Sequence, residues 1–186
     1  MSSRQIIDCG ATIKKVVPPF PELENKKFPY PLEPDGNIQE QIYNLLKDMP
    51  KLAQSAITQQ YNEYYIFRYT ENKEAIAPIQ YFSRDERGLP ILEFPKFIPL
   101  ASDKTFYRFT DEESLIEFGR IAGKLNVDFK EIKDFIEKVK NLCYEFDLYI
   151  DDMMYNLSNM GYNKDYGFRI IDYGLCYNSG KYELVI

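Results

Sequence analysis

The chain has 186 residues, of which 45% are hydrophobic and 16% aromatic, so it can bury one sizeable core but is short for two ordinary domains. Its net charge is −6 at pH 7, which makes nucleic acid and anionic membranes poor candidates as partners. Histidine is absent, which removes the commonest metal ligand and every Ser-His or Cys-His nucleophile. An enzyme of this composition would have to work with carboxylates.

The sequence predicts a soluble protein in a reducing compartment. The first residues, MSSRQIIDCG, lack the apolar run of a signal peptide, and no segment reaches the roughly 20 apolar residues of a membrane-spanning helix. Cys9, Cys143 and Cys176 are widely spaced and form no CxxC pair, which is typical of reduced thiols. We therefore expect no export by a signal peptide and no membrane partner.

Residues 1–36 are predicted to form an extended, proline-rich arm. The stretch PPFPELENKKFPYPLEPDG, which begins at residue 18, has too many prolines for a continuous helix or an inner strand. We expect Phe20, Phe28 and Tyr30 to pack on the body of the protein, with a surface for a partner as the alternative. Residues 37–186 are expected to form a single domain.

Two helices and a hairpin are predicted next. Asn37 with Glu40 is similar to a capping box, and apolar residues follow at helical spacing as far as Pro50. We expect a helix over residues 52–69 as well, although part of this stretch could form a buried strand. Short apolar runs over residues 76–82 and 89–94 flank the charged turn SRDERG, and they predict an antiparallel hairpin.

The second half is predicted to contain two more helices and a second hairpin. Thr110 with Glu113 and Asp128 with Glu131 are capping boxes, and each precedes an amphipathic helix. The second hairpin is expected from residues 153–157 and 168–171, joined by a polar, glycine-containing connection. These patterns by themselves indicate a chain that mixes helices and strands.

The residues best suited to chemistry lie in FDLYIDDMMY and IIDYG, which contain Asp147, Asp152 and Asp172 at predicted loop and strand-end positions. Transfer of a phosphoryl group from a nucleotide needs a carboxylate near the attacking hydroxyl and one or two oxygen ligands for magnesium. A helix, an aspartate loop, a hairpin and an Asp-aromatic-Gly sequence, in that order, supply those parts.

These segments resemble the protein-kinase-like family, whose catalytic loop contains Asp-x4-Asn and whose magnesium-binding end is Asp-Phe-Gly or Asp-Tyr-Gly. The similarity covers roughly residues 58–175 and is to the small kinase-like proteins encoded by bacteriophages. The shared features are Ala77-Pro78-Ile79, Glu93-Phe94, Pro99-Leu100 and Asp172-Tyr173-Gly174. The resemblance implies an α+β fold, namely a compact kinase-like domain with a reduced N-terminal lobe and a truncated C-terminal lobe, in the host cytoplasm or the virion.

The resemblance also implies roles for individual residues, with Mg and ATP as the possible cofactors. Asp147 would be the catalytic base, and Asp152 and Asp172 would be the magnesium ligands. The cofactor-binding residues would be Glu63, Glu93 and Phe94.

The register of the catalytic loop stays open. We prefer Asp147 as the base because Asp152 then continues into the predicted strand, as the family's loop does. Asp151 with Asn156 also has the Asp-x4-Asn spacing. In a third register, Asn159 lies at the family's usual distance from Asp172, but the base position then falls on Met154.

The sequence departs from the family pattern at both ends. Gly10 stands alone where a glycine-rich phosphate loop is expected, and only LCYNSGKYELVI follows the Asp-Tyr-Gly. The conceivable phosphate-pairing lysines, each expected to be solvated surface charge, are Lys14, Lys15, Lys47 and Lys51. We therefore favour a degenerate kinase-like protein that binds a host or viral protein. The alternatives are an active Mg-dependent phosphotransferase using ATP and a structural virion protein whose proline-rich arm wraps a neighbour.

Overall fold

In the computed structural model the chain forms two compact units, each described by itself. Unit 1 contains residues 1–69, 78–96 and 179–186, and unit 2 contains residues 70–77 and 97–178. The structure describes residues 4–29, 36–101, 112–146, 148 and 157–174, without the side chains of 36–39 and 112–115. The predicted α+β class is confirmed at this level. The single domain that we expected over residues 37–186 stays a prediction.

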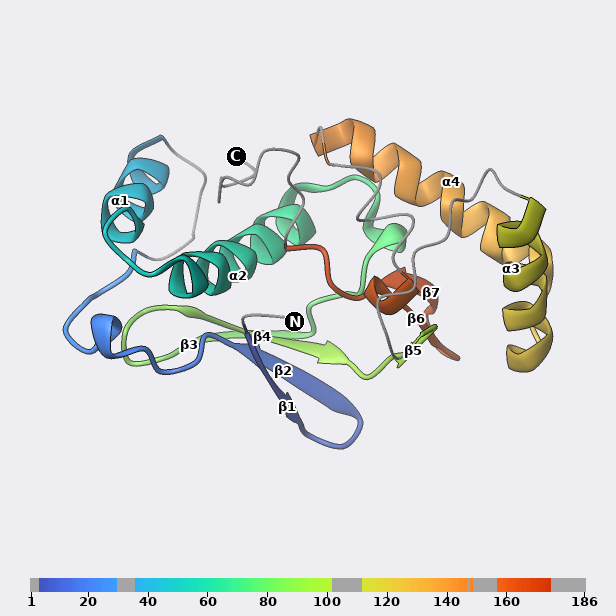
Figure 1. Cartoon of the computed structure of the whole chain (residues 1–186), viewed down its shortest axis with the longest axis horizontal. Coiled ribbons are helices and arrows are strands. Elements are labelled where there is room, and N and C mark those ends of the chain that lie inside the picture. Colours follow the sequence, from blue (N-terminus) through green and yellow to red (C-terminus); the bar gives the residue numbers. More distant parts are fainter. Residues whose placement is uncertain (1–3, 30–35, 102–111, 147, 149–156, 175–186) are drawn as a thin grey trace. The chain divides into compact units, whose positions relative to one another are not determined.

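Unit 1 is built on a four-stranded antiparallel sheet with the strand order β1-β2-β4-β3 (Figure 1). Its strands are β1 (Gln5–Asp8), β2 (Thr12–Val16), β3 (Tyr81–Arg84) and β4 (Pro90–Pro95). The first two strands lie in the segment that we expected to be an extended arm. A strand is usually recognised by alternating apolar and polar residues. In β2 this alternation is obscured, because Lys15, one of two adjacent lysines, faces the interior where an apolar residue is usual.

The described part of unit 1 also contains the helices α1 (Gly36–Leu46) and α2 (Lys51–Tyr69), and Figure 1 shows α2 running along one face of the sheet. The helix predicted over residues 52–69 is confirmed. The core between these elements is apolar and aromatic, and its larger members include Leu23, Phe28, Ile42, Ile57, Tyr61, Tyr65 and Leu89. Burial raises the pKa of the Tyr61 hydroxyl, which donates a 2.9 Å hydrogen bond to the Pro29 carbonyl.

The proline-containing segment packs onto the turn between β3 and β4. The Phe28 amide donates to the Arg87 carbonyl at 2.8 Å, and the Phe28 side chain is buried in the core. Gly88 has a φ of +90°, and a Cβ at this position would lie 2.5 Å from the Phe28 carbonyl oxygen. Glycine is therefore required here for two reasons. Phe20 packs against the same core as predicted, whereas Tyr30 lies outside the described residues.

The first predicted hairpin forms, but its first strand begins at Tyr81 rather than at Ile76. Ile76 instead makes a parallel bridge to Ile170, and the Ala77 amide donates to the Ile170 carbonyl at 2.8 Å. Residues 76 and 77 therefore belong to unit 2. The apolar run was continuous in sequence, but Pro78 removes a backbone donor inside it.

The described residues of unit 2 include two α-helices and a small antiparallel sheet with the strand order β5-β6-β7. Its elements are α3 (Glu112–Leu125), α4 (Phe129–Phe146), β5 (Ile98–Pro99), β6 (Met160–Asn163) and β7 (Gly167–Ile170). The Asp128 carboxylate accepts a 2.8 Å hydrogen bond from the Lys130 amide, which is the predicted N-cap of α4. Burial raises the pKa of the Cys143 thiol on α4 to about 12, as suits a packed, reduced cysteine.

Of the strand predicted over residues 153–157, residues 153–156 lie outside the described residues. The first strand of this hairpin is β6, and Leu157 lies in a short 3₁₀ turn, Leu157–Asn159, directly before it. A Cβ at Gly161 would lie 2.8 Å from the Phe97 Cβ and 3.2 Å from the Ile98 carbonyl oxygen. Close approach of β5 therefore requires this glycine, which in sequence indicated a connection rather than a strand.

Candidate functional site

In unit 1, the carboxylate of Glu63 on α2 is held by two cations. Arg4, directly before β1, donates from Nη1 to Glu63 Oε2 at 2.6 Å and from Nη2 to Oε1 at 3.1 Å. Lys15 on β2 donates from Nζ to Oε1 at 2.6 Å. The exposed fractions of the three side chains are 1% for Arg4, 4% for Lys15 and 0% for Glu63. We call these three residues the Glu63 cluster.

The Glu63 cluster is fixed to the sheet by a neighbouring amide. The Gln60 Nε2 group, one helical turn before Glu63, donates to the Lys15 carbonyl at 2.6 Å and to the Pro90 carbonyl at 2.9 Å. Its Oε1 atom accepts from Arg4 Nη1 at 3.3 Å. Because Gln60 joins α2 to both β2 and β4, it sets the distance between the strand lysine and the helix glutamate.

The Lys15 ammonium also lies over an aromatic ring. Its Nζ is 4.8 Å from the centre of the Phe94 ring, at which distance a cation–π attraction operates. Phe94 is buried, and its neighbour Glu93 accepts from the Thr12 hydroxyl at 2.6 Å and pairs with Lys14 at 3.5 Å. The predicted residues Glu63 and Phe94 therefore both contact Lys15, while Glu93 contacts Lys14.

Of the four candidate lysines, Lys15 differs from what we expected. We expected solvated surface charge at all four, and Lys15 is buried. Lys14 has a side chain 42% exposed, and Lys47 and Lys51 are exposed. Arg4 was missed altogether, because a single arginine before a short strand carries no pattern that marks it as buried.

In unit 2, Asp172-Tyr173-Gly174 directly follows β7 and Ile171. Tyr173 is fully buried, and its hydroxyl donates to the Ala77 carbonyl at 3.1 Å. The Ile171 amide donates to the Asn159 carbonyl at 2.7 Å, so the backbone before Asp172 is bonded to the residue before β6. Asp172 itself is half-buried. The hairpin thus brings the Asn159 and Asp172 segments together.

The observed hairpin bears on the open register of the catalytic loop. Asn159 is the last residue before β6, which is the position that the third register gives to the magnesium-binding asparagine. The preferred residues Asp147 and Asp152, together with the alternatives Asp151, Met154 and Asn156, lie outside the described residues.

A magnesium site beside Asn159 and Asp172 would need only a few protein oxygens. Mg²⁺ commonly takes one or two carboxylates and keeps several waters, so an amide oxygen from Asn159 and a carboxylate from Asp172 are suitable donors. In the part of the chain that the structure describes, no group of three or more Cys, Asp or Glu side chains is placed to hold a metal.

Comparison with known proteins returned no similar family model, no similar curated protein and no similar solved structure. Among the described helices, none has both the length and the hydropathy needed to cross a membrane. A functional conclusion must therefore come from the geometry of the two units.

Proposed function

We propose that this chain is a kinase-like protein that works by binding a protein partner, of host or viral origin, and does not transfer phosphate. Its kinase-like character is supported in unit 1 by the pairing of Lys15 on the strand β2 with Glu63 on the helix α2. Protein kinases use such a Lys–Glu pair to orient the phosphates of ATP. In unit 2 it is supported by an asparagine, a hairpin and Asp172-Tyr173-Gly174 in succession.

The observation that carries the non-catalytic role is the start of β6 directly after Asn159. In the family pattern, the base precedes this asparagine by five positions. The residue at that position here is Met154, whose thioether cannot accept the proton of an attacking hydroxyl. Without this base, the groups that position the nucleotide and the metal remain, but the residue that activates the acceptor hydroxyl is missing.

The turn between β1 and β2 supports the same role. Only Cys9, Gly10 and Ala11 separate the two strands, and Gly10, with a φ of +88°, is the single glycine in this turn. A phosphate loop needs several consecutive backbone amides that face the ligand. A three-residue turn is too short to cover a triphosphate, so tight nucleotide binding is not expected from unit 1.

Phosphoryl transfer from γ-labelled ATP with magnesium tests the proposal, with the protein itself and a general acceptor as substrates. We expect no transfer above background in the natural protein, and no difference in Asp147→Ala, Asp151→Ala or Asp152→Ala. Magnesium-dependent transfer that disappears in one of these three variants would overturn the non-catalytic role. The residue whose loss abolishes transfer would then identify the register.

Thermal unfolding with and without excess ATP and magnesium tests the nucleotide site separately. We expect a shift in Tm of less than about 1 °C, since a ligand near or below its dissociation constant adds little stability. A shift of several degrees that is lost in both Lys15→Met and Asp172→Asn would instead indicate a working nucleotide site.

A further inference from the structure

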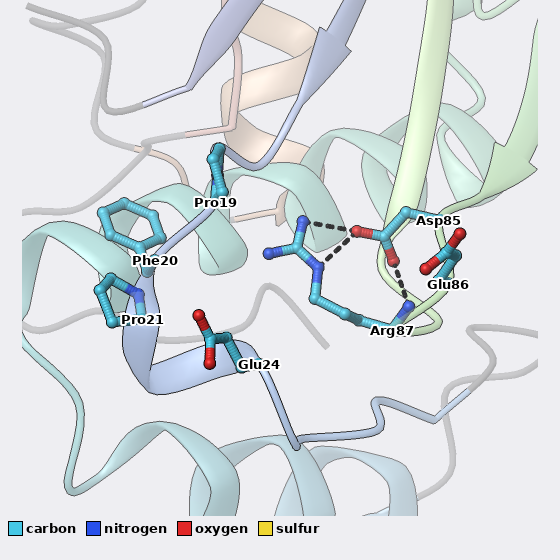
Figure 2. A pocket seen from close by; sticks show the side chains of 7 residues that line it. All are labelled: Pro19, Phe20, Pro21, Glu24, Asp85, Glu86 and Arg87. Carbon is cyan, nitrogen blue, oxygen red and sulfur yellow. Dashed lines mark hydrogen bonds and ion pairs between the residues drawn. The ribbon is translucent and has the colours of Figure 1, made fainter.

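A pocket of about 470 Å³ lies between the proline-containing segment and the β3–β4 turn of unit 1. Figure 2 shows Phe20 and Glu24 on one side and Arg87 on the other. The complete lining is Pro19, Phe20, Pro21, Glu24, Asp85, Glu86 and Arg87. We call this the arm pocket. None of the residues to which the kinase-like resemblance gives a role lines it.

The walls of the arm pocket are held together by hydrogen bonds. Arg87 Nη2 donates to the Val17 carbonyl at 3.1 Å, which joins the turn to the start of the proline-containing segment. The Phe28 amide donates to the Arg87 carbonyl, which joins the turn to the end of that segment. Prolines restrict the backbone between these two points. The pocket is therefore preformed, which lowers the entropy cost of binding.

The charge of the arm pocket is negative. Its lining carries three carboxylates and one guanidinium, a net charge of −2. The guanidinium of Arg87 is already paired with Asp85, at 2.7 Å from Nε and 2.6 Å from Nη2. Lys27 lies nearby and donates to the backbone carbonyl of Glu86, which reduces the charge of the region to −1. Both Glu24 and Glu86 are exposed to solvent.

The remaining surface of the arm pocket is apolar. Phe20 is half-buried and offers an aromatic ring, and Pro19 and Pro21 are exposed beside it. An apolar wall with carboxylates at its rim matches a side chain that has an apolar stem and a cationic end, namely lysine or arginine. A carboxylate-bearing segment would be repelled.

We propose that the arm pocket is the docking site for a basic segment of a protein partner, with a Lys or Arg side chain inserted beside Phe20 and attracted by Glu24 and Glu86. This deepens the proposed binding role, and rests on it, by naming the chemistry of the partner. Electrostatic complementarity of this kind accelerates association and excludes acidic partners.

The test uses the full chain and two fluorescein-labelled peptides, GRLKPRLG and its acidic counterpart GELEPELG, in fluorescence anisotropy titrations. We expect the basic peptide to bind in a salt-dependent manner and the acidic peptide not to bind. The variant Glu24→Lys/Glu86→Lys should weaken basic-peptide binding about tenfold or more, since two attractive charges become repulsive. The matched control Glu40→Lys/Glu71→Lys changes the net charge equally at exposed positions elsewhere and should bind nearly as the natural protein does.

Three results would overturn the docking site. They are equal binding of both peptides, equal weakening in the test and control variants, and complete displacement of the basic peptide by an equal concentration of spermidine, which would indicate a site for small amines. A urea unfolding curve of each variant excludes loss of fold as the cause of weaker peptide binding. Phosphoryl transfer in the ATP assay would overturn the proposed function alone, so the two failures are distinguishable.

Discussion

Glu63 in unit 1 and Glu145 in unit 2 both hold chain segments together, but in opposite surroundings. The Glu63 carboxylate is fully buried, and it accepts hydrogen bonds from the cations Arg4 and Lys15. The Glu145 carboxylate, near the end of α4, is exposed and accepts from neutral groups of the turn after α2. Its donors are Thr70 Oγ1 at 2.6 Å, the Glu71 amide at 2.7 Å and Asn72 Nδ2 at 2.8 Å.

The difference shows what each glutamate depends on. A buried carboxylate requires nearby positive charge, because desolvation of an unpaired ion costs several kcal/mol. An exposed carboxylate can be stabilised by neutral donors, since water shares in its solvation. Burial by itself would raise the pKa of Glu145, but the hydrogen bonds from Thr70, Asn72 and the backbone outweigh burial and hold that pKa below its usual value.

The largest expected effect is that of Glu63→Gln. This change leaves the buried cations Arg4 and Lys15 without the carboxylate that they share, and breaking a buried ion pair from one side typically costs about 3–5 kcal/mol. We expect a loss of this size in the free energy of unfolding, measured by urea denaturation, or failure to fold. The matched control Glu145→Gln should lose much less. Similar losses in the two variants would contradict the comparison.

Much of the fold could be predicted because it follows from local patterns. The helices α2 and α4 form where apolar periodicity and the Asp128 cap predicted them. The strands β1 and β2 could not be predicted in this way, because a buried lysine replaces an apolar residue in β2 and β1 is exposed along its whole length. The position of β2 depends on pairing with β4, which is distant in sequence, and that of β1 on pairing with β2.

The candidate site was predictable only in part. Glu63 was selected from the sequence by its place on a helix, yet the lysine that pairs with it could not be chosen among four candidates. The choice depends on which strand face meets α2, and a shift of one residue would exchange Lys14 for Lys15. Arg4 was missed because its role comes entirely from tertiary contacts with α2.

The next effect in size separates the two cations of the Glu63 cluster. Arg4→Met removes two hydrogen bonds to Glu63 and one to Gln60, whereas Lys15→Met removes one bond to Glu63 and the contact with Phe94. We expect losses of about 2–3 kcal/mol for Arg4→Met and about 1–2 kcal/mol for Lys15→Met, since hydrogen bonds to charged groups contribute about 1.5–3 kcal/mol and the remaining cation still neutralises Glu63.

A double-mutant cycle by urea denaturation measures how far the two cations replace one another. The double variant Arg4→Met/Lys15→Met should lose more than the sum of the single losses, because only then is the Glu63 carboxylate buried without the two cations that pair with it. Strict additivity would show that each cation acts alone, and it would contradict the account of the cluster as one unit.

The smallest expected effect is that of Glu145→Ala, about 1 kcal/mol, because solvent replaces part of what the neutral donors Thr70 and Asn72 supply. The lowered pKa of Glu145 fixes the direction in which this stabilisation changes with pH. A carboxyl group whose pKa is lower in the folded than in the unfolded state contributes its full stabilisation above the ordinary value, 4.5, and loses it as the pH falls through the folded value. The difference in unfolding free energy between the natural protein and Glu145→Ala should therefore be constant near neutral pH and shrink below pH 4.5. A difference that stays unchanged into acid would mean that Glu145 stabilises the turn by packing and not as an ionised acceptor.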